Sequence, residues 1–267
     1  MRPHLERRRS GQRHPVEDFL FDYYHLSPAK LRRWHPGAGV VLAGPEAEAY
    51  LELASYRRVP GGVEADPDRL AKHAGRLRDV RRLLVATGSR PPSYRCFGLH
   101  EWAMVHRLDQ DGVRHPDWPL RLGPADTDRV VETHQLACSH VDAFRFFTPT
   151  ARPLNTLQPT RDQQVALEQP GCLHAGMDCY KWAYQLVPVV PSELVMDCFD
   201  LARDIRVLDM RASPYDLSAL GYQAIPIETR EGKAEYVEAQ RAFSARSQDL
   251  RRRLLDATAA ALTASAA

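Results

Sequence analysis

The sequence has few of the features that mark membrane or secreted proteins. No stretch of its 267 residues approaches the roughly 18 uninterrupted apolar residues of a membrane span, and no apolar signal core follows the N-terminal arginines. The five cysteines form no C-x-x-C pair and their number is odd, so the sequence indicates neither a disulfide framework nor a four-thiolate zinc site. We therefore expect a cytoplasmic protein with no membrane partner.

Common cofactor and catalytic motifs are also missing. The chain contains no G-x-G-x-x-G, no P-loop and no G-x-S-x-G elbow. It also has none of the H-E-x-x-H, H-x-H or E-x-x-H spacings of common metal sites. The sequence thus requires no cofactor, although a metal ion held by histidines and carboxylates from separate segments remains open.

Charge is unevenly distributed along the chain. Residues 1–14 hold five arginines against one glutamate, a formal charge of +4, which leaves −2 for residues 15–267 out of the total of +2. A duplex-DNA binder usually shows a basic face, so the slightly acidic body supports a small molecule or a single nucleic-acid base better than duplex DNA as partner. We expect residues 1–14 to form a disordered basic arm.

The pattern of apolar residues predicts a mainly α fold with a few short strands (α+β), built as a single helical domain over residues 15–262, with a disordered tail over 263–267. Apolar residues at helical spacing and Ser-Pro or Asp-Pro starts predict most of the elements. Helices are expected over 27–34, 46–55, 66–88, 93–108, 171–187, 192–208 and 231–261. Strands are expected over 40–42, 56–59 and 222–228, and 129–136 fits either a strand or a helix.

His174 and Asp178 lie four residues apart in the helix expected over 171–187, so their side chains project from one face. The aspartate could orient the imidazole and raise its basicity, both residues could bind one metal ion, or the two could simply share a hydrogen bond in the core. The neighbouring Tyr180, Lys181 and Trp182 provide the aromatic and polar groups of a substrate pocket.

His140 and Asp142 follow Cys138 at every second position. On a strand all three side chains would face one side, whereas on a helix Cys138 and Asp142 would share a face and His140 would point away. Arg145 would bind a substrate carboxylate or phosphate, or pair with Asp142.

Glu101 is a further catalytic candidate. Burial next to Trp102 would raise its pKa, as suits a general acid or base, and a structural ion pair with an arginine is the alternative.

Arg211 precedes an expected helix start at Ser213-Pro214, where anions bind well, and is a candidate substrate-binding residue. The other charged residues of the helix over 192–208 and its end, including Arg206 and Asp209, are expected on a solvated face.

Four segments resemble a group of actinobacterial proteins commonly labelled 3-methyladenine DNA glycosylase, from about residue 14 to residue 246. They are HPVEDFLFDYYHLSPAKLRRWHPG, HVDAFRFFTPTARPLN, EQPGCLHAGMDCYKWAYQL and ELVMDCFDLARDIRVLDMRASPYDL. The resemblance implies DNA-repair hydrolysis of the N-glycosidic bond of an alkylated purine. Asp142 or Asp178, or else Glu101, would then position the water, and an aromatic ring would stack on the extruded base. The stacking candidates are Trp182, Tyr180 and Trp102.

Two other functions fit the same residues. A small-molecule enzyme, with or without a metal ion, would use His140, His174 and a carboxylate, with Arg145, Lys181 or Arg211 binding an acidic substrate. A binding module without catalysis would use these groups only to hold a ligand or a partner chain.

Overall fold

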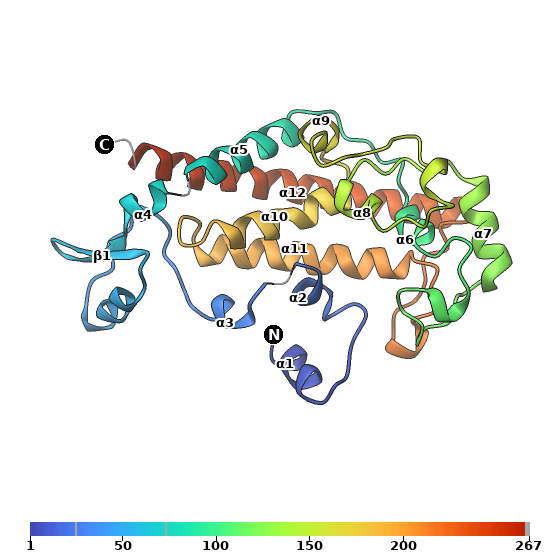
Figure 1. The fold of residues 1–267 in the computed structure, drawn as a ribbon, viewed down its shortest axis with the longest axis horizontal. Coiled ribbons are helices and arrows are strands. Elements are labelled where there is room, and N and C mark those ends of the chain that lie inside the picture. Colours follow the sequence, from blue (N-terminus) through green and yellow to red (C-terminus); the bar gives the residue numbers. More distant parts are fainter. Residues whose placement is uncertain (25, 73, 265–267) are drawn as a thin grey trace.

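The computed structural model describes residues 1–24, 26–72 and 74–264, and its fold is mainly α, as expected. Three long helices form the body: α10 (Leu173–Gln185), α11 (Ser192–Arg211) and α12 (Arg230–Ala264). They run side by side, and each contacts the other two (Figure 1). Because apolar side chains recur every three or four residues along α11, from Leu194 to Leu208, one face of that helix is buried against its neighbours.

The shorter elements surround this body. Helix α5 (Ala74–Gly88) packs against α12 and α9, and α6 against α7. The remaining helices are α1 (Arg2–Arg9), α2 (Phe19–Tyr23), α3 (Pro28–Leu31), α4 (Pro67–Ala71), α6 (Leu99–Ala103), α7 (Gly123–Thr133), α8 (Val141–Phe144) and α9 (Gln164–Leu167). Four 3-10 turns are η1 (Pro45–Glu52), η2 (Gln110–Gly112), η3 (Arg152–Leu154) and η4 (Ser218–Leu220). No helix within the described residues has both the length and the apolar content to cross a membrane.

Strands β1 (Tyr56–Val59) and β2 (Gly62–Ala65) form a two-stranded antiparallel sheet at one end of the molecule. The strand expected over 56–59 is therefore confirmed. Of the strand expected over 40–42, only Leu42 pairs, as an isolated bridge to Val63. The segment expected as a helix over 46–55 is the 3-10 turn η1.

Two other expected elements are wrong. The long helix over 93–108 is reduced to α6, because Phe97 and Gly98 both adopt positive φ (49° and 72°) and a right-handed helix cannot run through them. The edge strand expected over 222–228 does not form, because Ile225 N donates to the Arg211 carbonyl at the end of α11 instead of to a neighbouring strand. The ambiguous segment 129–136 belongs mostly to helix α7.

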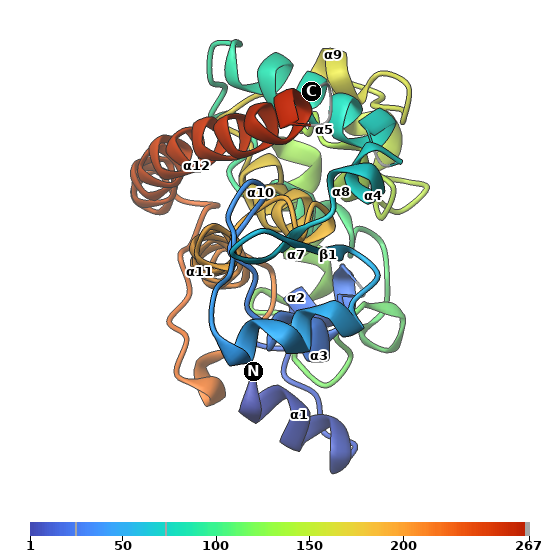
Figure 2. The same cartoon turned by 90° about the vertical axis from the view of Figure 1, so that its left-hand side faces the viewer.

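Residues 1–14 do not form the disordered arm expected from their charge. Residues 2–9 form helix α1, which lies below α2 on the side of the body away from α12 (Figures 1 and 2). The buried carboxylate of Asp18 holds this helix, because it pairs with His4 Nδ1 at 2.9 Å and with the Arg7 guanidinium. At the other end, α12 continues to Ala264 instead of ending before an expected tail at 263, and residues 265–267 lie outside the described part.

Candidate functional site

A row of three buried imidazoles crosses the interior beside helix α10. His174 from α10 lies between His100 from α6 and His140, the residue before α8. The ring centroids are 4.5 Å apart for His100 and His174, and 5.3 Å apart for His174 and His140. Carboxylates flank both ends of the row, so segments distant in sequence combine into one charged centre.

The first carboxylate cluster surrounds His140, whose side chain is 0% exposed. Its Nε2 lies 3.4 Å from Glu168 Oε1 and 3.4 Å from Asp178 Oδ2. Burial alone would lower the pKa of His140, but the charges of Glu168 and Asp178 outweigh this effect and raise it. Neither ring nitrogen of His140 makes a hydrogen bond within the described residues: Nε2 has only the two long ion-pair contacts, and Nδ1 has no polar partner. Burying polar nitrogens in this way is costly.

Asp178 is held by several cationic or donor groups. Tyr24 donates its hydroxyl to Asp178 Oδ1 at 2.8 Å, and Lys181 Nζ lies 3.2 Å from Oδ2. Although burial would raise the pKa of Asp178, Lys181 and His140 hold it well below its usual value. Lys181 also donates to Asp142 Oδ2 at 3.2 Å, so one ammonium bridges the two carboxylates.

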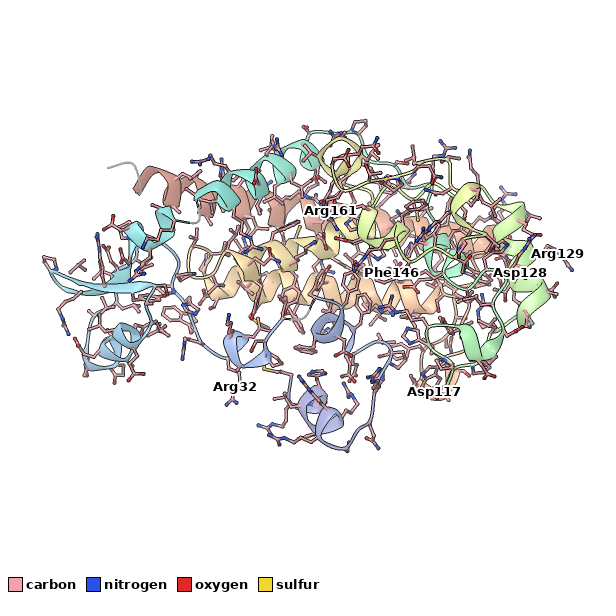
Figure 3. The ribbon with its side chains drawn as sticks, in the orientation of Figure 1. Arg32, Asp117, Asp128, Arg129, Phe146 and Arg161 are labelled. Atoms are coloured by element: carbon pink, nitrogen blue, oxygen red, sulfur yellow. The ribbon has the colours of Figure 1, made fainter. Side chains whose placement is uncertain are left out.

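Asp142 connects this cluster to the surface. Besides Lys181, its carboxylate binds the guanidinium of Arg161, which is 59% exposed and lies near α8 (Figure 3). The expected pairing with Arg145 is weak, because Arg145 Nε lies 3.7 Å from Asp142 Oδ1 and the arginine is 54% exposed. Arg161 is therefore the main surface cation of Asp142.

The second carboxylate cluster lies at the other end of the row. His100 Nε2 is 3.2 Å from Asp209 Oδ2, and Tyr236 donates to Asp209 Oδ1 at 3.0 Å. Burial opposes the charged forms, yet the mutual attraction raises the pKa of His100 and lowers that of Asp209 to about 2. His174 has no such carboxylate partner, so burial and the neighbouring His100 lower its pKa to about 3 and keep it neutral.

Within the part of the chain that the structure describes, two sets of three side chains bring potential metal-ligand atoms within 4.8 Å of one another. One set is His140, Glu168 and Asp178, and the other is His100, His174 and Asp209. Imidazole and carboxylate ligands suit first-row divalent ions. The expectation that His174 and Asp178 act together is wrong, because one helical turn separates them and each joins a different set.

The carboxylate of Glu101 is structural in this fold. It forms an ion pair with Arg206 at 2.6 Å, with side chains 6% and 2% exposed. Burial would raise the pKa of Glu101, but Arg206 holds it below its usual value, contrary to the rise expected from the sequence. The expectation of a solvated face is therefore also wrong for Arg206 and Asp209.

The aromatic candidates occupy different environments. Trp102 is 0% exposed and donates its Nε1 to the Ala212 carbonyl, and Tyr180 is also 0% exposed, so neither ring is open to a base. Trp182 is half-buried and packs under Lys181, whose Nζ lies 4.4 Å from its ring centroid. Arg211 lies away from both clusters, with its side chain on the Gln223 carbonyl and Glu235.

Glu168 and Asp209 were not identified from the sequence as site residues. Helical spacing contained a signal for Asp209, since it follows buried Ile205 by four residues and buried Ala202 by seven. Glu168 directly follows the short helix α9 and has no periodic signal. Its place beside His140 depends on how that loop packs.

A surface cavity of about 650 Å³ lies on the far side of Tyr23 from Asp142. Tyr23 separates the two, because it lines the cavity and its hydroxyl donates to the Asp142 carbonyl at 3.4 Å. Two guanidinium groups, of Arg114 and Arg145, lie over the Phe146 ring at 4.6 and 4.4 Å from its centroid. Phe146 and Asp117 of this cavity are labelled in Figure 3.

Comparison with known proteins adds no further assignment. The chain matches no protein-family model, no curated protein and no solved structure.

Proposed function

We propose that this protein is a metal-dependent enzyme whose reactive ion is held by His140, Glu168 and Asp178, and whose substrate is a small anionic molecule. The single observation that carries the proposal is the buried His140 ring, which has no hydrogen bond on either nitrogen while its Nε2 faces two carboxylates. A first-row divalent ion would satisfy that nitrogen and both acids together.

The spacing of the ligand atoms supports this assignment. Ligands about 2.1 Å from a tetrahedral ion lie about 3.4 Å from one another. Both measured separations, from His140 Nε2 to Glu168 Oε1 and to Asp178 Oδ2, are 3.4 Å. Outer contacts also fix the acids, since Gln164 donates to Glu168 Oε1 at 2.5 Å and Tyr24 to Asp178 Oδ1.

The neighbouring charges suit hydrolysis. A bound ion would lower the pKa of a coordinated water and so supply a nucleophile near neutral pH. Lys181, which joins Asp178 to Asp142, would hold both carboxylates in place while the proton on His140 is displaced. Metal binding would therefore weaken as the pH falls below the raised pKa of His140.

The cavity beside Tyr23 supports an anionic substrate with a flat apolar group. Three arginines line it against two aspartates, and neither Arg13 nor Arg114 forms an ion pair among the described residues. The aromatic rings that line it are Phe19, Tyr23, Trp118 and Phe146. Planar guanidinium groups bind carboxylate and phosphate oxygens well, and the aromatic rings would stack on a flat group. The five cysteines are free, which suits action in the reducing cytoplasm.

Hydrolysis of the N-glycosidic bond of an alkylated purine is the second candidate, in line with the family resemblance. The observation that favours it is the aromatic cavity, whose lining residue Tyr23 contacts the backbone of Asp142. Phe146 or Tyr23 would stack on the base, and Asp142 behind Tyr23 would position the water. This candidate needs no metal ion, so chelation separates the two.

The test is metal analysis of the purified protein after loading with Zn²⁺, Mn²⁺ or Fe²⁺ and removal of excess ion. We expect bound metal in the wild type and its loss from the site of His140, Glu168 and Asp178 in His140→Ala. We expect no change in His134→Ala, which alters a histidine outside both clusters. Release of free base from alkylated DNA would be measured with and without a chelator. A metal-free protein that releases base would overturn the metal proposal and favour the second candidate.

A further inference from the structure

We infer that His100, His174 and Asp209 form a second metal position, so that the protein holds a two-metal centre. The inference rests on the proposed function for the role of the first position. The second position has two imidazoles and one carboxylate, with the Cys96 thiol next to them. This ligand set favours Zn²⁺ or another first-row divalent ion over Mg²⁺ or Ca²⁺, which prefer oxygen ligands.

The ligand atoms converge from three helices, α6, α10 and α11. They lie within 4.8 Å of one another, and His100 Nε2 is already 3.2 Å from Asp209 Oδ2. His174 is 5% exposed, and its imidazole forms no hydrogen bond among the described residues. An imidazole without a hydrogen-bond partner among the described residues, next to a His and Asp pair, is the arrangement that a metal ion completes.

The space beside these residues fits one small occupant. A cavity of about 10 Å³ is lined by His100, His174, Cys96, Tyr236 and Gln240, among others. Asp209 does not line it, but its carboxylate hydrogen-bonds two residues that do, His100 and Tyr236. That volume is about the size needed for one water molecule. The Oε1 atom of Gln240 is buried without a hydrogen-bond partner in the described part of the chain, so a second lining group also lacks its partner. These free polar atoms indicate an occupant that is polar or charged.

Outer contacts would orient the ligands. Tyr236 donates to Asp209 Oδ1, which leaves Oδ2 facing His100. The thiol of Cys96 lies 3.5 Å from His100 Nδ1, so Nε2 is the nitrogen on the side of Asp209. Ligating histidines and carboxylates usually have such partners.

His174 connects the two positions, since its ring contacts both His100 and His140. An ion at each end of the imidazole row would place two positive centres in one buried site. Hydrolases that use paired ions hold them about 3.5–4 Å apart. The two sets here share no residue and lie at opposite ends of the row, so the second ion would hold α6, α10 and α11 together rather than contact the substrate.

The experiment measures the number of Co²⁺ or Zn²⁺ ions bound per chain, by titration of metal-free protein and by elemental analysis. We expect two ions in the wild type and in His134→Ala. His174→Ala and, as a nearly isosteric second variant, Asp209→Asn should each bind one ion, and His140→Ala should bind one ion of the other position. Circular dichroism of each metal-free variant identifies any that fail to fold. If His174→Ala or Asp209→Asn fails to fold, the number of ions bound by the other variant tests the second position.

The outcomes separate this inference from the proposed function. If the wild type binds one ion, and this ion is lost in His140→Ala but kept in His174→Ala and Asp209→Asn, the second position is overturned and the proposed function stands. One ion that is lost in the His174 and Asp209 variants and kept in His140→Ala would support the second position and overturn the first. A wild-type protein that binds no ion would overturn both.

Discussion

The buried ion pair between Glu101 and Arg206 allows a quantitative test of the assignment of Glu101 as a structural residue. Its side chains are 6% and 2% exposed and its atoms lie 2.6 Å apart. Arg206→Met would leave the Glu101 carboxylate in the core without its partner. Breaking a buried pair from one side typically costs about 3–5 kcal/mol in the free energy of unfolding. For a chain of this size, that corresponds to a fall in Tm on the order of 10 °C.

The matched control is Arg203→Met, one turn earlier on α11. Arg203 is 58% exposed and its carboxylate contacts lie at 3.6 and 3.8 Å, so its loss should change the free energy of unfolding by less than about 0.5 kcal/mol. The double variant Glu101→Met/Arg206→Met removes both charges. We expect it to recover about 2–3 kcal/mol of the free energy of unfolding relative to Arg206→Met alone, because no unpaired charge is left in the core.

Urea unfolding followed by circular dichroism measures all four proteins. If Arg206→Met loses no more stability than Arg203→Met, or if the double variant recovers nothing, Glu101 is not held by this pair. Its carboxylate would then return as a candidate for catalysis.

Three further predictions concern other buried groups. Burial and the nearby Arg206 lower the pKa of His115 to about 4 in the folded protein, whereas His115 titrates near 6.5 in the unfolded chain. As the pH falls, the unfolded state therefore takes up the proton first, which should lower the free energy of unfolding by about 2 kcal/mol by pH 5. Between pH 7 and pH 5, His115→Gln should lose less stability than the wild type. Equal losses in urea titrations would contradict this. Asp18→Asn should release α1 and speed tryptic cleavage at its arginines, and an unchanged rate would show that other contacts hold the helix. Tyr24→Phe should cost about 1.5–3 kcal/mol by removing a hydrogen bond to buried Asp178, whereas Tyr23→Phe, whose bond to a carbonyl is long at 3.4 Å, should cost less; similar losses would refute the distinction.

Several parts of the fold follow from local sequence. The spacing of apolar residues along α11 predicts a helix that begins at Ser192, and the structure has that start. Strand β1 and its following Pro-Gly-Gly turn also agree with the local pattern. The failures, such as the helix over 93–108, occur where backbone dihedral angles are set by packing, as at Gly98 beside Tyr236.

The sequence by itself determined which residue types gather in the middle of the chain, because histidines and carboxylates are visible at 100–101, 140–142 and 174–178. It also determined that most of these residues lie on or beside helices, since helix formation depends largely on neighbours three and four positions away. Only the tertiary structure decided their partners. His174 and Asp178 share one helix, but they lie one turn apart along it. His174 therefore meets Asp209, 35 residues away in sequence, whereas Asp178 meets Glu168, 10 residues away. Such pairings depend on how separate segments pack, and the spacing of residues within one segment contains no information about them.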